Sequence, residues 1–416
     1  MKIFVPKEKR PHESRVALSP EVVKKLVEMG CRVSIEKGAG EGVSFLDSDF
    51  QQAGAQIVKH GPDMYKGSHV IFKVQRPLED EIKHYPENVM LISTLSILNN
   101  KDDLERYAKH KVSAFALELI PRITRAQSMD VLSSQSNLAG YRAVIEASFL
   151  YDRAFPMMMT AAGTISPAKV LVIGAGVAGL QSIATARRLG AVVSGYDVRA
   201  AAKEQVESLG ATFVEVGAAA NAEAAGGYAK EVDADYRRRQ EEKLKEVVKG
   251  IDIIITTALI PGREAPKIIS EDMLKNMKPG SVVVDLAVEM GGNCFGSVLG
   301  QTVEKHGVKI LGPANLPSQI GRNASELYAR NVLNFFKLIY DAETKKLALN
   351  QEDEIVQATL LTHQGKVLRW ELVKGAEPVA KKTKPAATKS ASQKAAPKKE
   401  TMAAKKPVKW SPKNAL

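Results

Sequence analysis

Short apolar runs and amphipathic stretches alternate along residues 1–373. The apolar runs nearest the N-terminus predict five short strands, at Ile3–Val5, Arg32–Ile35, Val70–Val74, Val89–Ser93 and Ser113–Leu117. A helical pattern starts with Ser19 as N-cap and Pro20 at the first helical position, and it runs to Met29 before Gly30. Strands that alternate with helices predict a parallel sheet covered on both faces.

A second alternating series begins at Lys169. Its predicted strands are Lys169–Ile173, Val192–Tyr196, Thr212–Val216, Asp252–Thr256 and Ser281–Asp285. A long helical pattern, Gln135–Ala154, separates the two series, and another, Ala324–Tyr340, follows the second. We therefore expect two α/β domains, residues 1–134 together with 318–373 and residues 135–317, with a ligand cleft between them.

Composition supports a folded, intracellular chain. Of 416 residues, 44% are hydrophobic and 25% are charged, which is an ordinary globular mix. Two distant cysteines, Cys31 and Cys294, exclude a disulfide framework and a cysteine zinc site. No apolar run approaches the ~18–20 residues of a membrane span, and the N-terminus lacks the apolar core of a signal peptide. We expect a cytoplasmic chain without direct membrane insertion.

The positive charge is concentrated at one end of the chain. Residues 374–416 hold twelve lysines and two acids, so they carry +10 of the net +12 and leave +2 for the rest. Since this segment has almost no large aliphatic side chains, we predict a disordered tail. A spacer is the favoured interpretation, and contact with anionic lipid or an acidic partner is the alternative. The nearly neutral body indicates no nucleic-acid-binding face.

The most specific motif is Gly174-Ala-Gly176-Val-Ala-Gly179. It follows the predicted strand that ends at Ile173 and opens the predicted helix Val177–Leu189. In this context the first glycine permits a tight turn, the second lets the backbone approach a pyrophosphate, and the third allows close packing of helix and strand. Free N–H groups at the helix N-terminus favour phosphates. The pattern predicts that both doubly wound domains are Rossmann-like and that the second binds a dinucleotide.

Asp197 ends the next predicted strand, 18 residues after Gly179. A carboxylate there is placed to accept hydrogen bonds from the adenosine ribose and to repel a 2′-phosphate. The sequence therefore favours NAD(H) over NADP(H), although Arg199, two residues further on, acts in the opposite direction.

Other polar or glycine-rich segments follow predicted strands. Pro121–Asn137 packs a base, amides, an acid and hydroxyls into one turn, which suits a carboxamide; alternatively it is a linker with Ser136 or Asn137 near the helix N-cap. Residues 217–250 form either a lid carrying Tyr228 or a surface excursion with a helix at Asp235–Lys249. Ala258–Gly262 and Asp285–Asn293 are either ligand-edge loops or ordinary connections. Met157–Met159 indicates adaptable packing or an oligomer interface.

Together these stretches closely resemble the soluble NAD(H)-binding domain of the proton-translocating nicotinamide nucleotide transhydrogenases, in the form where it is a separate alpha-subunit polypeptide. The resemblance covers about residues 1–373 and is most specific at Pro121–Asn137, Met157–Gly163, the glycine turn, Ala225–Glu231 and Asp285–Asn293. It implies an enzyme of the Si-specific/Re-specific type that passes hydride directly from NADH to NADP(H) held on a beta subunit. It also implies a homodimer that docks on membrane-spanning subunits at the cytoplasmic face of the inner membrane.

The resemblance also assigns site residues. The loop implied to hold the nicotinamide and its ribose contains Arg122, Gln127, Ser128, Met129, Asp130 and Ser133. Gln127 is the residue implied to reach toward the second nucleotide. The remaining implied cofactor contacts are Gly174, Gly176, Val177, Gly179, Asp197, Val198, Arg199, Gly227, Tyr228, Gln240 and Leu259. No metal is implied.

Alanine dehydrogenase has the same fold and gives the competing interpretation. Two of its substrate positions are retained, as Arg15 and Lys73, but its catalytic histidine position falls at Ser96 and its catalytic aspartate position reads Glu289. Oxidative deamination needs an acid/base group, whereas hydride transfer between two nicotinamides moves no proton through a side chain. The sequence therefore favours direct transfer. A non-enzymatic NAD(H)-binding module is the other alternative.

Overall fold

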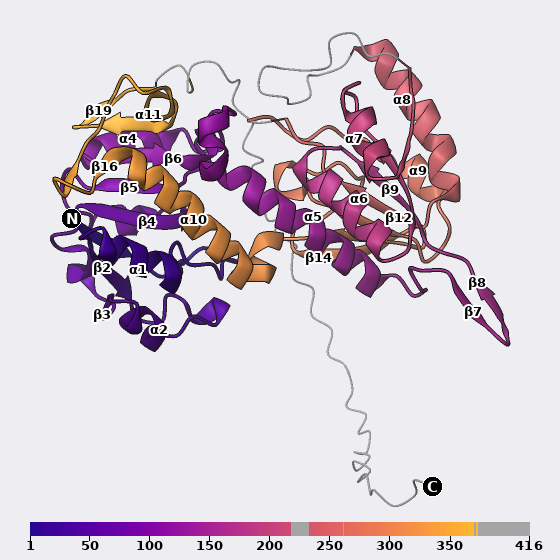
Figure 1. The fold of residues 1–416 in the computed structure, drawn as a ribbon. Coiled ribbons are helices and arrows are strands. Elements are labelled where there is room, and N and C mark those ends of the chain that lie inside the picture. The colour runs from indigo at the N-terminus through magenta and orange to yellow at the C-terminus, as the bar shows by residue number, and fades with distance from the viewer. Residues whose placement is uncertain (218–232, 261, 370–371, 373–416) are drawn as a thin grey trace, which may run out of the picture. The chain divides into compact units, whose positions relative to one another are not determined.

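The computed structural model describes residues 1–217, 233–260, 262–369 and 372, all of which belong to one compact unit (Figure 1). The predicted tail, residues 374–416, lies outside the described residues, as do Gly227 and Tyr228.

The first sheet has eight strands. In spatial order they are β19 (Lys366–Val367), β18 (Leu360–His363), β6 (Ser113–Ala116), β5 (Met90–Thr94), β4 (Val70–Gln75), β1 (Lys2–Val5), β2 (Arg32–Glu36) and β3 (Gln56–Val58). Strands β1 to β6 are parallel, and β18 and β19 extend the sheet in antiparallel fashion. The order of strands therefore reverses between β1 and β4, the switch point of a doubly wound sheet.

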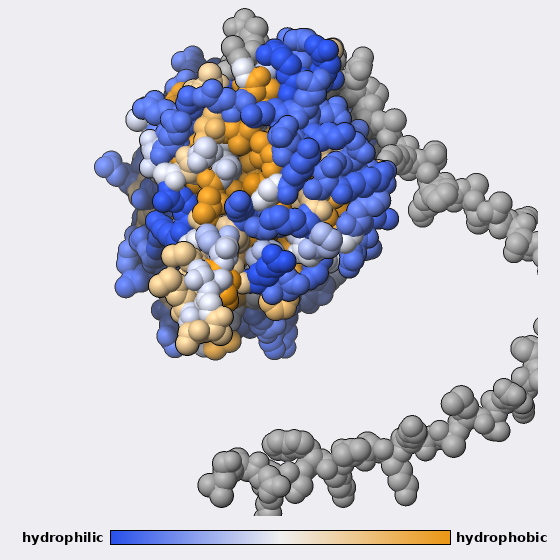
Figure 2. Space-filling view, turned by 90° about the vertical axis from the view of Figure 1, so that its right-hand side faces the viewer, coloured by the Kyte–Doolittle hydropathy of each residue, from blue (hydrophilic) through white to orange (hydrophobic). Residues whose placement is uncertain are grey.

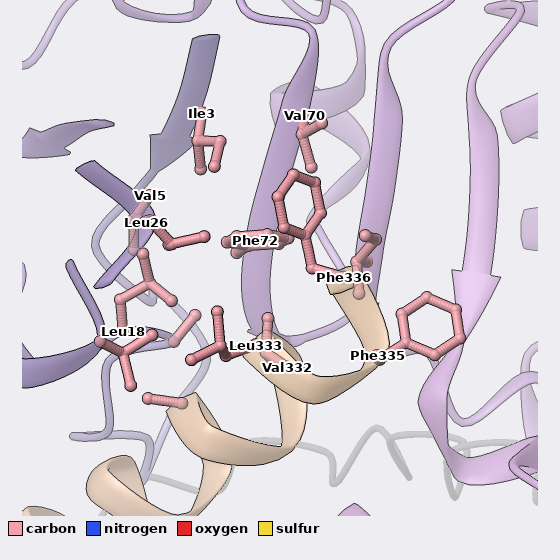
Figure 3. Packing of buried hydrophobic residues seen from close by; sticks show 14 of the residues in the cluster. Ile3, Val5, Leu18, Leu26, Val70, Phe72, Val332, Leu333, Phe335 and Phe336 are labelled. Atoms are coloured by element: carbon pink, nitrogen blue, oxygen red, sulfur yellow. The ribbon is translucent and has the colours of Figure 1, made fainter. Parts of the chain in front are cut away.

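Helices cover both faces of this sheet. They are α1 (Pro20–Glu28), α2 (Asp47–Gln52), α10 (Gly321–Ile339) and α11 (Glu354–Thr359) on one face, and α3 (Glu79–Ile82) and α4 (Asp102–Lys109) on the other. A small two-stranded sheet of β16 (Tyr340–Asp341) and β17 (Lys346–Leu347) follows α10. Helix α10 comes from the far end of the chain, yet its Phe336 packs edge-on against Phe72 of β4, with 5.6 Å between ring centroids (Figure 3). The N-terminal sheet is thus completed by C-terminal segments.

The second sheet has seven strands. In spatial order they are β11 (Thr212–Phe213), β10 (Val192–Tyr196), β9 (Lys169–Ile173), β12 (Ile253–Thr256), β13 (Val282–Asp285), β15 (Val308–Gly312) and β14 (Gln301–Lys305). All except the edge strand β14 are parallel. Its helices are α5 (Val131–Leu150), α6 (Val177–Arg188) and α7 (Ala202–Ser208) on one face, and α8 (Ala234–Val247) and α9 (Glu271–Lys275) on the other. The switch point lies between β9 and β12.

The chain passes between the sheets twice. Helix α5 begins with Val131 in the core of the first sheet and reaches the core of the second with Ala143, Val144 and Ala147. The return passes through Leu316, in the second core, into α10, in the first. The glycine of α5, Gly140, makes a close crossing with α6, since a Cβ there would lie 2.1 Å from the Ala178 carbonyl oxygen.

The predicted α/β fold with two Rossmann-like sheets is confirmed, but several predicted boundaries are wrong. The helix predicted at Gln135–Ala154 spans Val131–Leu150, because the Asp130 side chain accepts from the Ser133 N–H (2.9 Å) and caps it; neither Ser136 nor Asn137 is the N-cap. The strand predicted at Thr212–Val216 ends at Phe213, where pairing with β10 stops. A hairpin of β7 (Met158–Thr160) and β8 (Gly163–Ile165) was not predicted.

Candidate functional site

A cavity of about 1100 Å³ opens at the carboxyl ends of both sheets. The first sheet contributes Gln75 at the end of β4 and Thr94 at the end of β5. The second contributes Gly174 after β9 and Thr257 after β12, the two strands that flank its switch point. Ligands of open α/β sheets bind at this position, because the loops diverge there and leave a crevice.

The glycine turn forms one wall, and each glycine has a separate structural reason. Gly174 has φ +94°, a backbone conformation that side chains disfavour. A Cβ on Gly179 would lie 1.7 Å from the Gly174 carbonyl oxygen, so helix α6 approaches the turn as closely as glycine allows. A Cβ on Gly176, the N-cap of α6, would meet no atom within 4 Å. The turn therefore leaves open space beside the free N–H groups that begin α6.

Asp197 is buried at the end of β10, with 8% of its surface exposed. One carboxylate oxygen accepts from the Ala175 N–H in the glycine turn (2.7 Å). The Arg199 guanidinium pairs with both oxygens, at 2.9 Å from Nε and 2.8 Å from Nη2. The turn, the acid and the base that the sequence singled out thus form one contact group at the cavity wall.

The opposite side of the second sheet contributes a loop, residues 257–268, that Asn293 holds in place. The Asn293 side chain accepts from the Ala258 N–H (3.0 Å) and donates to the carbonyls of Ala258 and Pro266 (both 2.9 Å). Asp285 fixes Asn293 in turn, by accepting from its backbone N–H (3.1 Å). The Asp285–Asn293 stretch therefore acts through the loop that lines the cavity.

The predicted site residues are divided by the structure. Those that line the cavity are Arg122, Ser133, Gly174, Gly176, Val177, Asp197, Val198, Arg199, Gln240 and Leu259. Gln127 and Ser128 are exposed on a 3-10 turn, Thr124–Met129, and Met129 packs against the first core, so these three do not line it. Asp130 lies in a smaller neighbouring cavity with Arg122 and caps α5. Gly227 and Tyr228 lie outside the described residues.

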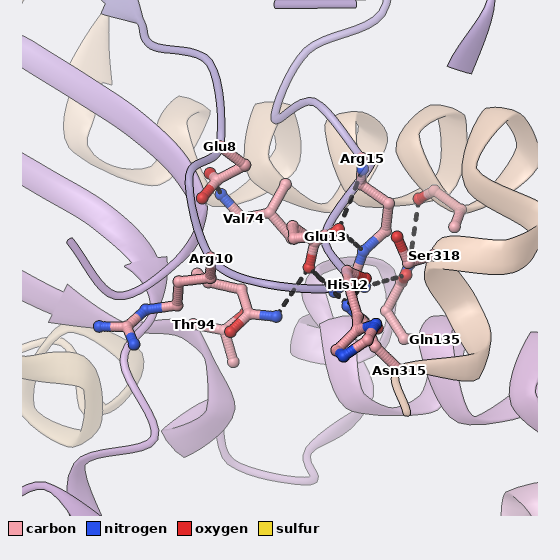
Figure 4. Close-up of polar contacts among 12 residues, drawn as sticks. Glu8, Arg10, His12, Glu13, Arg15, Val74, Thr94, Gln135, Asn315 and Ser318 are labelled. Carbon is pink, nitrogen blue, oxygen red and sulfur yellow. Dashed lines mark hydrogen bonds and ion pairs between the residues drawn. The ribbon is translucent and has the colours of Figure 1, made fainter. Parts of the chain in front are cut away.

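A buried polar cluster forms the floor of the cavity on the side of the first sheet (Figure 4). We call Glu13, Arg15, Gln75, Gln135 and Asn315 the Glu13 cluster. Arg15 donates to Glu13 through Nε (2.8 Å) and Nη2 (2.6 Å) and to the Gln135 side chain through Nη1 (2.7 Å). Gln75 and Asn315 donate to the same Glu13 carboxylate, at 2.7 and 2.9 Å. Sequence reasoning missed this cluster because its members are far apart along the chain.

The charge of Glu13 makes a pH-dependent contribution to stability. Burial alone would raise the pKa of Glu13, but the hydrogen bonds and charge of Arg15, with help from Gln75, lower it to about 2, below its ordinary 4.5. A depressed carboxyl pKa stabilises the fold above the unfolded value, and that stabilisation is lost as pH falls toward the folded value.

We expect Glu13→Gln to lower the free energy of unfolding by roughly 3 kcal/mol at neutral pH. Urea unfolding of both proteins at pH 7, 5 and 3.5 tests this. The difference between the wild type and the variant should be constant from pH 7 to 5 and should shrink at pH 3.5. A difference that grows on acidification would contradict the assignment.

Lys73 does not reach the cavity. It is 1% exposed, and its ammonium lies 3.3 Å from Glu8 and 3.3 Å from Glu81. Burial would lower the pKa of Lys73, but these two carboxylates outweigh it and raise the pKa. Lys73 is therefore a charged, paired group in the interior of the first sheet's other face, among residues such as Tyr65.

Comparisons with known proteins agree with this architecture. Residues 4–139 match the model of the alanine dehydrogenase/PNT N-terminal domain, and residues 143–370 match that of the alanine dehydrogenase/PNT C-terminal domain. The first part of the NAD(P) transhydrogenase subunit alpha of Rhodospirillum rubrum is 55% identical over 88% of this chain and 98% of its own length. An alanine dehydrogenase of Staphylococcus saprophyticus is 31% identical over 84% of this chain and 93% of its own. A crystal structure of a transhydrogenase from Sinorhizobium meliloti is 50% identical, covers 88% of this chain and all of that one, and has a TM-score of 0.80.

The two sheets and the glycine turn at a switch point define a Rossmann-like α/β protein. Its sequence is far more similar to the transhydrogenase subunit than to alanine dehydrogenase. The chain belongs to the alanine dehydrogenase/PNT family and, within it, to the NAD(P) transhydrogenase alpha subunits whose first part is a separate polypeptide, which are components of an enzyme. The family predicted from the sequence is thus confirmed. Among the described residues, no helix is long and apolar enough to cross a membrane.

Proposed function

We propose that the cavity binds NAD(H), with the pyrophosphate at the start of α6, the adenosine ribose at Asp197 and the nicotinamide toward Arg122 and Ser133. The observation that carries this is the glycine turn, whose N–H groups face open space beside Gly176 while Asp197 contacts the same turn. The cavity is large enough for a dinucleotide, since ligand sites of this kind span roughly 300–1,000 Å³. Val177, Val198, Gln240 and Leu259 complete its walls.

We expect Asp197→Ala to weaken NADH binding by about 1–3 kcal/mol, the range for leaving buried hydrogen-bonding groups unpaired. The ribose hydroxyls would lose their acceptor, and Arg199 would lose its carboxylate partner. Calorimetric titration of the variant with NADH measures the change. Unchanged affinity would remove Asp197 from the site.

We propose direct hydride transfer to NADP(H) held on a partner beta subunit. Bound NADH supplies the hydride, and the tasks left for this chain are to bind, to orient and to exclude water. Arg122 and Ser133 are placed to hold the nicotinamide end, and Gln127, Ser128, Met129 and Asp130 belong to the same loop. Because Gln127 is exposed, it is suited to meet a nucleotide on a neighbouring protein. Among the described residues that line the cavity there is no histidine, in keeping with a reaction that moves no proton.

Two ion pairs favour this function over alanine dehydrogenase. A 2-oxo acid needs free cations for its carboxylate, but Arg15 is bound by Glu13 and Lys73 by Glu8 and Glu81. We expect the purified chain to show no appreciable turnover of NAD⁺ with L-alanine. Turnover without a partner would overturn the choice.

We propose a homodimer whose interface includes the outer face of α5 and the β7–β8 hairpin. Phe149 of α5 is 84% exposed, and the hairpin exposes Met157 (60%) and Met159 (76%). A two-stranded hairpin is marginally stable in water on its own, so an apolar one that stands in solvent indicates a covered surface. In the space-filling view, apolar surface is gathered in a band between hydrophilic flanks (Figure 2). A second copy of the chain is the occupant that we propose.

We propose further that the subunit works at the cytoplasmic face of the inner membrane, docked on membrane-spanning transhydrogenase subunits that couple hydride transfer to proton translocation. The division into a first domain, residues 1–134 with 318–373, and a second, residues 135–317, belongs to the same proposal.

The lysine-rich tail has no role in the proposed cofactor site. Deleting residues 374–416 should leave the affinity for NADH within about twofold of the wild type, because the residues that carry the cleft all precede it. Calorimetric titration of the truncated chain checks this. A large loss of affinity would show that the tail contributes to binding.

A further inference from the structure

The Glu13 cluster joins segments that would otherwise meet only through the chain. Glu13 and Arg15 lie on the loop that leaves β1, and Gln75 ends β4, so three members belong to the first sheet. Gln135 lies in the second turn of α5, where the chain first leaves that sheet. Asn315 lies between β15 and α10, where the chain returns to it. The cluster therefore ties both passages between the sheets to the same buried ion pair.

The bonds within the cluster fix the two passages in different ways. On α5, Gln135 accepts from Arg15 (2.7 Å) and donates to the Ala324 carbonyl of α10 (3.1 Å). On the return, Asn315 has φ +47°, a left-handed conformation that costs energy and is held by its bonds to Glu13 and to the His12 carbonyl (both 2.9 Å). The neighbouring Ser14 and Ser318 are bonded to each other as well, at 2.7 Å from the Ser14 N–H to the Ser318 hydroxyl.

Stability alone is a weak reason for such a pair. The Glu13 side chain is 0% exposed and that of Arg15 is 8% exposed, and removing two charges from water costs nearly as much as their attraction returns. Buried ion pairs of this kind are best understood where they select one conformation. Here the conformation in question is the placement of α5 and of the 313–320 segment relative to the first sheet.

We propose that Glu13 and Arg15 are positioning residues that hold the two halves of the cleft at the separation that hydride transfer requires. The proposal rests on the proposed function. The nicotinamide end, at Arg122 and Ser133, lies where α5 begins, and the pyrophosphate end, at Gly176, lies on the second sheet. A small rotation about the two passages would move one end against the other. Glu13 and Arg15 would act through Gln135 and Asn315, without a bond to the reacting carbon.

The test compares Arg15→Lys and Gln135→Met with Arg76→Lys. Arg15→Lys keeps the charge but loses the paired guanidinium contacts, and Gln135→Met keeps the helix but loses the acceptor. Arg76→Lys is the matched control, since Arg76 pairs with Asp103 (3.0 Å) in the first sheet's layers and does not line the cavity. Spin labels at Lys24→Cys on α1 and Lys243→Cys on α8 report the separation of the two sheets, and both native cysteines are buried. Labelled chain is mixed with excess unlabelled chain so that each dimer carries one labelled copy.

We expect the distance distribution to broaden in Arg15→Lys and Gln135→Met but not in Arg76→Lys. With the partner subunits and NADP⁺ present, hydride transfer should fall at least about tenfold in the first two while NADH affinity stays within about threefold, because small misplacements cost rate more than binding. Distributions and rates equal to those of Arg76→Lys would overturn the proposal, as would a broadened distribution with an unchanged rate. If the wild-type chain transfers no hydride, the proposed function fails, and the distance measurement alone then decides whether the cluster positions the sheets.

Discussion

Gly179→Ala should abolish tight NADH binding and destabilise the fold. The added Cβ would lie 1.7 Å from the Gly174 carbonyl oxygen and 3.3 Å from the Thr257 hydroxyl, so α6 must move away from the turn. Overpacking of this kind typically costs about 1–3 kcal/mol, and contact with rigid backbone puts this site at roughly 3. Moving α6 also misplaces the N–H groups that we propose for the pyrophosphate. Since a hydrogen bond to a charged group contributes about 1.5–3 kcal/mol, affinity should fall roughly 30- to 100-fold.

Two other glycines separate the two effects of this substitution. Gly176→Ala should leave stability nearly unchanged but weaken NADH binding, because its Cβ would enter open space at the proposed phosphate position. Gly250→Ala, where a Cβ also meets no atom within 4 Å, lies outside the cavity and should change neither. Urea unfolding and calorimetric titration of all three variants give the result. Normal affinity in both Gly179→Ala and Gly176→Ala would show that the turn does not hold the dinucleotide.

Phe149→Asp should convert the proposed dimer into monomers. The ring is 84% exposed in the single chain, so the substitution costs the monomer little, but in a dimer it would bury a carboxylate in an apolar interface. Central aromatic residues of interfaces commonly contribute 2 kcal/mol or more, so the dimer dissociation constant should rise at least ~100-fold, allowing for the buried charge. Sedimentation velocity over a range of concentrations measures this shift.

The matched control is Leu46→Asp. Leu46 is 57% exposed and lies beside α2 in the layers of the first sheet, away from α5 and the hairpin. This variant should sediment as the wild type does. A Phe149→Asp protein that stays dimeric at low concentration would place the interface elsewhere on the molecule.

Local chemistry explains which features the sequence could predict. The glycine turn is six residues long, and every steric requirement on it comes from within the turn or from the strand beside it, so Gly174, Gly176 and Gly179 could be interpreted directly. The N-cap Ser19 was predictable for the same reason, because its hydroxyl accepts from the Val22 N–H three residues on. The alternation of strands and helices likewise gave both parallel sheets.

Features that depend on distant contacts could not be predicted in this way. The start of α5 at Val131 depends on Asp130, whose polar neighbours offered several equally plausible caps. Glu13 and Asn315 are 302 residues apart, and nothing in either local pattern indicates the other. The hairpin of β7 and β8 exposes the methionines that the sequence had suggested for packing, and their neighbours in an assembly are not encoded in any periodicity.

The most direct test of the account follows deuterium from NADH to NADP⁺. The purified chain, its membrane-spanning and beta-subunit partners, and NADH deuterated at C4 of the nicotinamide ring are mixed with NADP⁺, and the products are analysed by mass spectrometry. The account predicts that the label arrives in NADPH undiluted by solvent hydrogen, and that omitting this chain stops the transfer. Loss of the label to water, or no transfer with all subunits present, would contradict direct hydride transfer from the cleft described above.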